Sequence, residues 1–161
     1  MIFLHGLGDS GHGWSQADWN LPFAKLIFPN APERPITVNG GARMPGWWVP
    51  YSNLFLGCTA NDVTAIRFDI RSFDKNFENE SNFDSDGFSQ SKALIDDIIA
   101  REVAAGIPHN RIILGGFSQG GAVTLFTGLQ AEHALGGLLV MSSWMPARWR
   151  FPGKEPNPMS Q

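Results

Sequence analysis

Short apolar runs alternate with longer amphipathic stretches along this chain, and the alternation predicts its secondary structure. The runs typical of buried strands are Ile2–Leu4, Lys25–Phe28, Arg111–Leu114 and Gly137–Met141. The clearest helix is expected over Phe88–Ala105, where apolar residues recur on one face and charged residues occupy much of the rest. A second helix is expected from about Gln119 to Gln130. Alternating strands and helices indicate an α/β fold with a mainly parallel sheet.

Two segments interrupt this alternation. Residues 30–48 contain Pro, Gly and Asn throughout, so we expect a surface loop there rather than a long helix or a central strand. Residues 49–86 are interpreted as an atypical insertion or loop within a single domain that spans residues 1–161. Their scattered carboxylates have no regular ligand spacing, which favours a solvated loop over a metal site.

The last residues of the central strand lead into a G-x-S-x-G motif, Gly116-Phe117-Ser118-Gln119-Gly120. Between a strand and a helix, this motif is typical of the nucleophile elbow of α/β-hydrolases. The turn strains the backbone of the serine and exposes its hydroxyl at the top of the sheet, while the glycines avoid collisions with neighbouring elements. The motif predicts Ser118 as the nucleophile. The alternative is a glycine-rich turn without chemistry.

A glycine-rich loop over residues 5–14 directly follows the first strand. In α/β-hydrolases, the loop after an early strand and the residue after the nucleophile each supply a backbone N–H to the developing oxyanion. We therefore predict Leu7 and Gln119 as the two donors. Fixed dipoles of this kind are often the largest catalytic contribution. The alternative is that the glycines serve only a turn.

Four apolar residues are candidates for walls of a substrate pocket: Met44, Trp47, Trp48 and Trp144. The first three lie in the Pro- and Gly-rich segment, and Trp144 lies in the loop Ser142–Pro146 after the last strand, at the functional edge of such a sheet. For the first three, the equally supported alternative is that their side chains only pack the segment onto the core.

Composition excludes several other classes of protein. The 161 residues include 43% hydrophobic residues, which indicates a globular domain, and a formal charge of −3, which gives no reason to expect a nucleic-acid partner. No apolar run reaches the length of a transmembrane helix. Cys58 is the only cysteine, so an internal disulfide is excluded and a reducing compartment is weakly favoured.

The base and acid of a catalytic triad are not evident in this sequence. A serine needs a histidine to take its proton and an acid to orient that histidine, and in α/β-hydrolases both follow the serine. After Ser118 the sequence has no Asp and only one His, His133, near the expected end of the second helix. At ~1.5 Å per residue that helix places it ~20 Å from the serine, too far for a base. His5 and His12 are weak substitutes on the loop.

Five segments together resemble the acyl-protein thioesterase/carboxylesterase (lysophospholipase) family of α/β-hydrolases. They are Phe3–Trp14, Pro29–Thr37, Met44–Trp47, Gly106–Pro108 with Arg111–Ala122, and Ser142–Pro146. The resemblance implies an α/β-hydrolase fold and a serine hydrolase that cleaves thioesters of S-acylated proteins, or esters of lipids and small acyl compounds. It also implies Ser118 as nucleophile, Leu7 and Gln119 as oxyanion donors, no cofactor and a cytoplasmic location.

The resemblance also predicts that the fold is incomplete at both ends of this chain. Family members have strands before the His-Gly loop, whereas this sequence starts within the strand that leads to it. The family's acid and base are expected beyond Gln161. Two classes of function therefore stay open: a thioesterase or esterase, and a catalytically impaired pseudo-hydrolase that only binds acyl ligands or a partner. The sequence does not indicate an oligomeric state.

Overall fold

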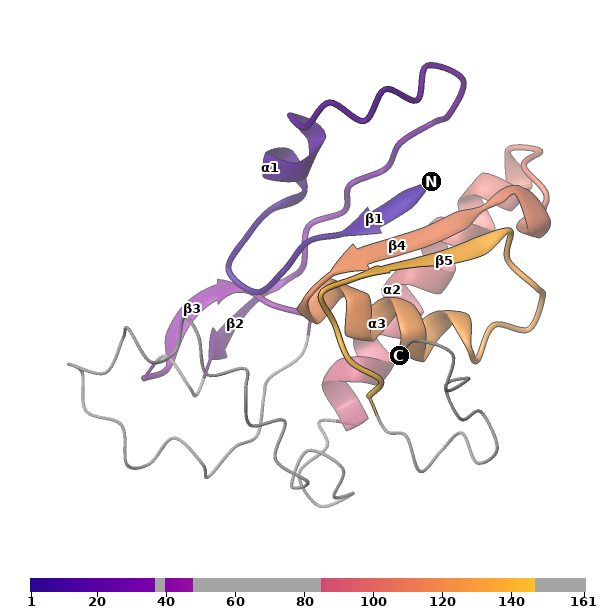
Figure 1. Cartoon of the computed structure of the whole chain (residues 1–161). Helices are drawn as coiled ribbons and strands as arrows, with labels where there is room; N and C mark the ends of the chain where they lie inside the picture. The colour runs from indigo at the N-terminus through magenta and orange to yellow at the C-terminus, as the bar shows by residue number, and fades with distance from the viewer. Residues whose placement is uncertain (37–39, 48–84, 147–161) are drawn as a thin grey trace, which may run out of the picture.

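The computed structural model describes residues 1–36, 40–47 and 85–146. Its central sheet has three parallel strands in the order β1-β4-β5, namely β1 (Ile2–Leu4), β4 (Ile113–Phe117) and β5 (Gly137–Met141). The strands lie side by side in Figure 1, with Leu4 opposite Gly116 and Gly116 opposite Val140. Because all three are parallel, the loops that follow them meet at one edge of the sheet, which is called the carboxyl edge below.

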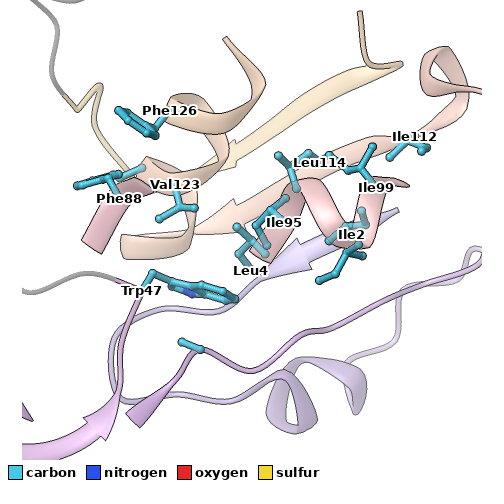
Figure 2. Packing of buried hydrophobic residues seen from close by; sticks show 13 residues of the cluster. Ile2, Leu4, Trp47, Phe88, Ile95, Ile99, Ile112, Leu114, Val123 and Phe126 are labelled. Atoms are coloured by element: carbon cyan, nitrogen blue, oxygen red, sulfur yellow. The ribbon is translucent and has the colours of Figure 1, made fainter. Parts of the chain in front are cut away.

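Two helices pack against one face of this sheet. They are α2 (Ser85–Ala104) and α3 (Gln119–Gly128). Alternate residues of the strands, such as Leu4 and Leu114, meet Ile95 of α2 and Val123 of α3 in a single buried cluster (Figure 2). A strand side chain on this face is enclosed between the sheet and the two helices, which explains why apolar runs predicted the strands.

On the opposite face of the sheet, aromatic side chains cover the side formed by β1. Phe3 of β1 packs against Trp14 of the short helix α1 (Gly11–Ser15) and against Trp19, with ring centroids 4.7 and 4.8 Å apart. Further along this face Ile113, Leu139 and Met141 are 41%, 38% and 40% exposed. Period-two alternation therefore divides β4 into a buried series and a partly exposed series.

The strand expected over Lys25–Phe28 is wrong, because only Ile27 pairs with the sheet. The Phe3 N–H donates to the Ile27 carbonyl, and the Ile27 N–H donates to the Met1 carbonyl, both at 2.9 Å. Two residues after this single bridge comes Pro29, which has no N–H with which to continue a ladder.

The surface loop expected over residues 30–48 is also wrong in part, because the segment contains a hairpin. Strands β2 (Glu33–Ile36) and β3 (Ala42–Pro45) pair antiparallel, and Gly40 and Gly41 adopt positive φ in the connection. Among the described residues of this segment, 30–36 and 40–47, no strand belongs to the central sheet, as predicted. A two-stranded ribbon consists of edge strands, where proline is tolerated, so the Pro content did not exclude strands.

The remaining boundaries differ from expectation by a few residues. Helix α2 begins at Ser85 instead of Phe88, so it includes the last two residues of the proposed insertion, and α3 ends at Gly128. A 3-10 turn over His109–Arg111 delays the start of β4 to Ile113. The rest of the expected insertion, residues 49–84, lies outside the described residues, so the single-domain description with an insertion stays a prediction.

We expect Leu114→Ala to lower the free energy of unfolding by about 2–5 kcal/mol, because it leaves a cavity in the fully buried cluster. The matched control is Ile113→Ala on the same strand, where the side chain is 41% exposed and the expected loss is well under half as large. Urea denaturation of both variants measures the difference. Equal losses would contradict the division of β4 into a buried and an exposed face.

Candidate active site

Ser118 lies in a sharp turn between β4 and α3 with a strained backbone. Its φ of 52° and ψ of −116° lie outside the regions that side-chain-bearing residues favour. A residue held in such a region typically costs about 1–3 kcal/mol, so the surrounding structure has to enforce it. Its side chain is partly exposed at the carboxyl edge. The predicted strained turn is confirmed, while the nucleophile role of Ser118 stays a prediction.

Two hydrogen bonds from β5 and the loop after it hold the turn in place. The Ser118 N–H donates to the Met141 carbonyl at 2.9 Å, and the Ser143 hydroxyl donates to the Ser118 carbonyl at 2.7 Å. The backbone N–H and the carbonyl of the strained residue are thereby both hydrogen-bonded, the first to β5 and the second to the loop after β5. The position of β5 beside β4 is therefore a condition for the turn.

The glycines around Ser118 are required by close backbone approaches. A Cβ on Gly116 would lie 2.4 Å from the Gly120 carbonyl carbon, and one on Gly120 would lie 2.3 Å from the Leu4 carbonyl oxygen. A Cβ on Gly121, for which the sequence analysis proposed no role, would lie 2.6 Å from the Ser143 Cβ. These contacts confirm the predicted reason for the glycines: α3 begins in direct contact with the ends of β1 and β5.

The loop after β1 comes close to Ser118. A Cβ built on Gly6 would lie 3.7 Å from the Ser118 Cβ, and the next residue is Leu7, which is partly exposed. Within the described ranges, the Leu7 N–H donates no hydrogen bond. Gln119 is the first residue of α3, where backbone N–H groups point out of the helix end. The structure thus brings both predicted donors to the carboxyl edge, and their role stays a prediction.

Trp47 is fully buried and joins the elements around the turn. Its indole N–H donates to the His5 carbonyl at 2.9 Å, and its backbone N–H donates to the Gln119 side-chain oxygen at 2.8 Å. Its carbonyl accepts a hydrogen bond from the Ser91 hydroxyl of α2. Of the two interpretations of Trp47, this burial supports packing onto the core. Sequence reasoning missed these bonds, since the partners are 42 to 72 residues away from Trp47.

The other predicted pocket residues occupy different positions. Met44 of β3 is partly buried, and its sulfur would lie 3.4 Å from a Cβ on Gly8 in the loop after β1. Trp144, in the loop after β5, is partly buried and packs against the core cluster. Trp48 lies outside the described residues. Met44 therefore lies beside the loop that carries Leu7, and the pocket role of these residues stays a prediction.

His5 is buried and uses both ring nitrogens in hydrogen bonds. Its Nδ1 lies 2.7 Å from the Gly6 carbonyl, and its Nε2 accepts a hydrogen bond from the Ala31 N–H at 3.0 Å. Burial lowers the pKa of this ring from its ordinary value, so the neutral form is favoured. With both nitrogens occupied, His5 has no free site at which to take a proton from Ser118.

The remaining histidines lie away from Ser118 or in solvent. His12 is exposed on α1. The rings of His109 and His133 are 4.5 Å apart, just before β4 and β5 begin, and thus at the end of the sheet opposite Ser118. The expected position of His133 near a helix end needs correction, because α3 stops at Gly128. The rings of His109 and His133 are therefore not placed to act on Ser118.

Among residues 1–36, 40–47 and 85–146, no three His, Cys, Asp or Glu side chains gather in a way that could hold a metal ion. None of their helices is long and apolar enough to cross a membrane.

A parallel sheet with a serine on a strained strand-to-helix turn, next to the loop after an early strand, defines the α/β-hydrolase class. A profile of the phospholipase/carboxylesterase family matches residues 1–55 and 57–159. The chain belongs to this family.

Relatives and solved structures agree with this assignment. The chain is 41% identical to acyl-protein thioesterase 1 of Cryptococcus neoformans over 91% of its length and 54% of the relative's. It is 40% identical to acyl-protein thioesterase 1 of Neurospora crassa over 98% of its length and 59% of the relative's. The fold superposes on SOBER1 of Arabidopsis thaliana with a TM-score of 0.64 at 29% identity, covering 90% of this chain and 61% of that one. The chain thus spans somewhat more than half the length of these relatives.

We expect Gly116→Ala to destabilise the protein by about 1–3 kcal/mol or more, because its Cβ would lie 2.4 Å from rigid backbone of α3. Gly137→Ala is the control, since nothing lies within 4 Å of a Cβ at that position, and its effect should stay within about 0.5 kcal/mol. Thermal and urea denaturation measure both. A tolerated alanine at position 116 would show that the close approach of α3 is not required.

Trp47→Phe should cost about 1–3 kcal/mol of stability beyond the loss of ring area, because it leaves the buried His5 carbonyl without this donor. Trp14→Phe is a matched control: it removes the same indole N–H, but from an exposed bond to Asp9 that water can replace. The comparison of the two unfolding free energies is the measurement. Similar losses would mean that the Trp47–His5 bond contributes little.

Proposed function

We propose that this protein is a serine hydrolase that cleaves acyl thioesters or carboxylic esters through Ser118. The observation that carries the proposal is the strained turn of Ser118, held at the carboxyl edge beside the loop of Leu7. The relatives named acyl-protein thioesterase 1 support S-acylated proteins as the substrate class. Lysophospholipids and small acyl esters are further substrates consistent with the family description.

In the proposed mechanism, the Ser118 oxygen attacks the acyl carbonyl carbon while its proton passes to a base. The carbonyl oxygen becomes an oxyanion that accepts hydrogen bonds from the Leu7 and Gln119 N–H groups. Collapse of this intermediate breaks the bond to the thiol or alcohol, which leaves protonated, and forms an acyl-serine. Water then attacks the acyl-serine by the same route and releases the acid.

The base and its orienting acid are not found among the described residues. Both ring nitrogens of His5 are occupied, and His109 and His133 lie at the opposite end of the sheet. The order of the triad in α/β-hydrolases places both groups after the nucleophile. Met44 and Trp144 are proposed as apolar contacts for the acyl chain, since each lies near the carboxyl edge and is only partly buried.

A second candidate is a pseudo-hydrolase that binds acyl ligands or a partner without turnover. The specific observation that favours it is that, among the described residues, neither the doubly bonded ring of His5 nor the distant pair His109 and His133 is placed to take the proton of Ser118. An oxyanion hole and binding can leave residual catalysis without a full triad. A cytoplasmic location is likewise a proposal, supported by the family resemblance and the single cysteine.

Ser118→Ala should lower hydrolysis of a short-chain nitrophenyl ester and of an acyl thioester by roughly 10³-fold or more, because the nucleophile is lost. The protein expressed from the complete gene is assayed, and Ser15→Ala is the control, since that serine is exposed on α1. A fluorophosphonate probe should label the native protein and the control but not the variant.

Two outcomes separate the candidates. Unchanged turnover in the Ser118→Ala variant would overturn the nucleophile assignment. A native protein that neither hydrolyses the esters nor reacts with the probe, but binds an acyl chain, would favour the pseudo-hydrolase.

A further inference from the structure

The ring of His5 is fully buried, takes no part in the proposed proton transfers and makes its shortest hydrogen bond to the Gly6 carbonyl, at 2.7 Å. That carbonyl belongs to the peptide whose N–H is the Leu7 donor. We infer that His5 is a positioning residue, whose ring holds the Gly6–Leu7 peptide so that the Leu7 N–H faces the oxyanion. The inference rests on the proposed function.

The partners of the ring determine its tautomer. The Ala31 backbone N–H is a donor, so the Nε2 that it contacts at 3.0 Å has to be the unprotonated acceptor. The Gly6 carbonyl is an acceptor, so Nδ1 has to carry the proton. The neutral ring with its hydrogen on Nδ1 is the one form that satisfies both contacts.

Planarity of the peptide bond transmits this hydrogen bond to the donor. In a trans peptide the C=O and the following N–H point in opposite directions within one plane. When the Gly6 carbonyl points toward the buried ring, the Leu7 N–H therefore points away from the ring. His5 orients this N–H through the peptide plane and makes no hydrogen bond to Leu7 itself. The Asp9 N–H also donates to the Gly6 carbonyl, at 3.2 Å, so the ring makes the shorter of two hydrogen bonds that hold this carbonyl in a loop where glycines flank Leu7.

The ring is itself fixed to the body of the fold, so it can act as an anchor. Ala31, which bonds Nε2, is buried in the segment that leads into β2. The His5 carbonyl accepts the indole N–H of Trp47 at 2.9 Å. His5 thereby attaches the loop after β1 to two segments distant in the sequence, to which the Gly8 N–H and the Gly11 N–H also bond, at the Pro45 carbonyl and the Asn30 side-chain oxygen.

Two substitutions separate the bonds of the ring. In His5→Asn, the amide N–H can replace Nδ1–H as donor to the Gly6 carbonyl, but nothing reaches the Ala31 N–H. In His5→Gln, the longer side chain can offer its oxygen to the Ala31 N–H in place of Nε2, but the bond to Gly6 is lost. Each variant thus loses one buried hydrogen bond, so the two should lose similar stability. His12→Gln, on an exposed ring, is the control.

For the protein expressed from the complete gene, kcat of His5→Gln should fall about 10²–10³-fold with little change in KM, as for the loss of an oxyanion donor. Its rate of labelling by a fluorophosphonate should fall in parallel. His5→Asn should keep kcat within about tenfold of the native value. Nitrogen NMR of the native ring should show a protonated Nδ1 and an unprotonated Nε2.

Equal losses of kcat in the two variants, in proportion to their lost stability, would show a purely structural role and overturn the inference. If neither variant folds, the NMR measurement decides: a native ring protonated on Nε2 would contradict the bond to Gly6, and one protonated on Nδ1 supports it. If the fluorophosphonate does not label the native protein at Ser118, the proposed function is overturned. The role assigned to His5 then falls with it, because it rests on that function.

Discussion

The strained backbone of Ser118 is the constraint on which the rest of the structure depends. A φ of 52° in a residue with a side chain persists only where neighbouring elements supply the opposing free energy. Here they are β5, which accepts the Ser118 N–H, and the loop after it, which donates to the Ser118 carbonyl. In the order β1-β4-β5, the serine turn follows the middle strand. On one side lies β5, which holds the turn, and on the other lies β1, whose following loop faces it.

A second requirement is that the polar groups buried at the carboxyl edge are satisfied. The backbone and indole of Trp47 bond to His5 of the loop, Gln119 of α3 and Ser91 of α2, each in a buried environment. An unmade bond of this kind costs more than a made bond contributes, so the network fixes the relative positions of its members. Dipoles held in this way need no reorganisation when a charge develops nearby.

The sequence predicted those parts of the fold whose signals are local. Ile2–Leu4 is an apolar run because it is buried in a parallel sheet, Gly137–Met141 is an apolar run of partly exposed residues in the same sheet, and the serine turn has a glycine pattern that close backbone contacts require. The single bridge at Ile27 and the hairpin at residues 33–45 were misjudged, since each depends on a partner strand. The role of Trp47 was left undecided because its partners are distant in the sequence, and the contacts of His5 had no local signal.

The two proposed oxyanion donors differ in what holds them. Gln119 begins a helix, and the orientation of its N–H follows from the regular hydrogen bonding of α3 and from the glycines that set the helix against β1. Leu7 lies in a loop with a glycine on either side, so no regular element determines the direction of its N–H. The carboxyl edge therefore has one half fixed by secondary structure. The other half is fixed by the side-chain bonds of His5 and Trp47 together with two backbone bonds, from the Asp9 N–H to the Gly6 carbonyl and from the Gly8 N–H to the Pro45 carbonyl. Trp47 bonds to both halves, and its buried hydrogen bonds add to the direct contact between Gly120 and the backbone of Leu4 and His5 in linking the geometry of one half to that of the other.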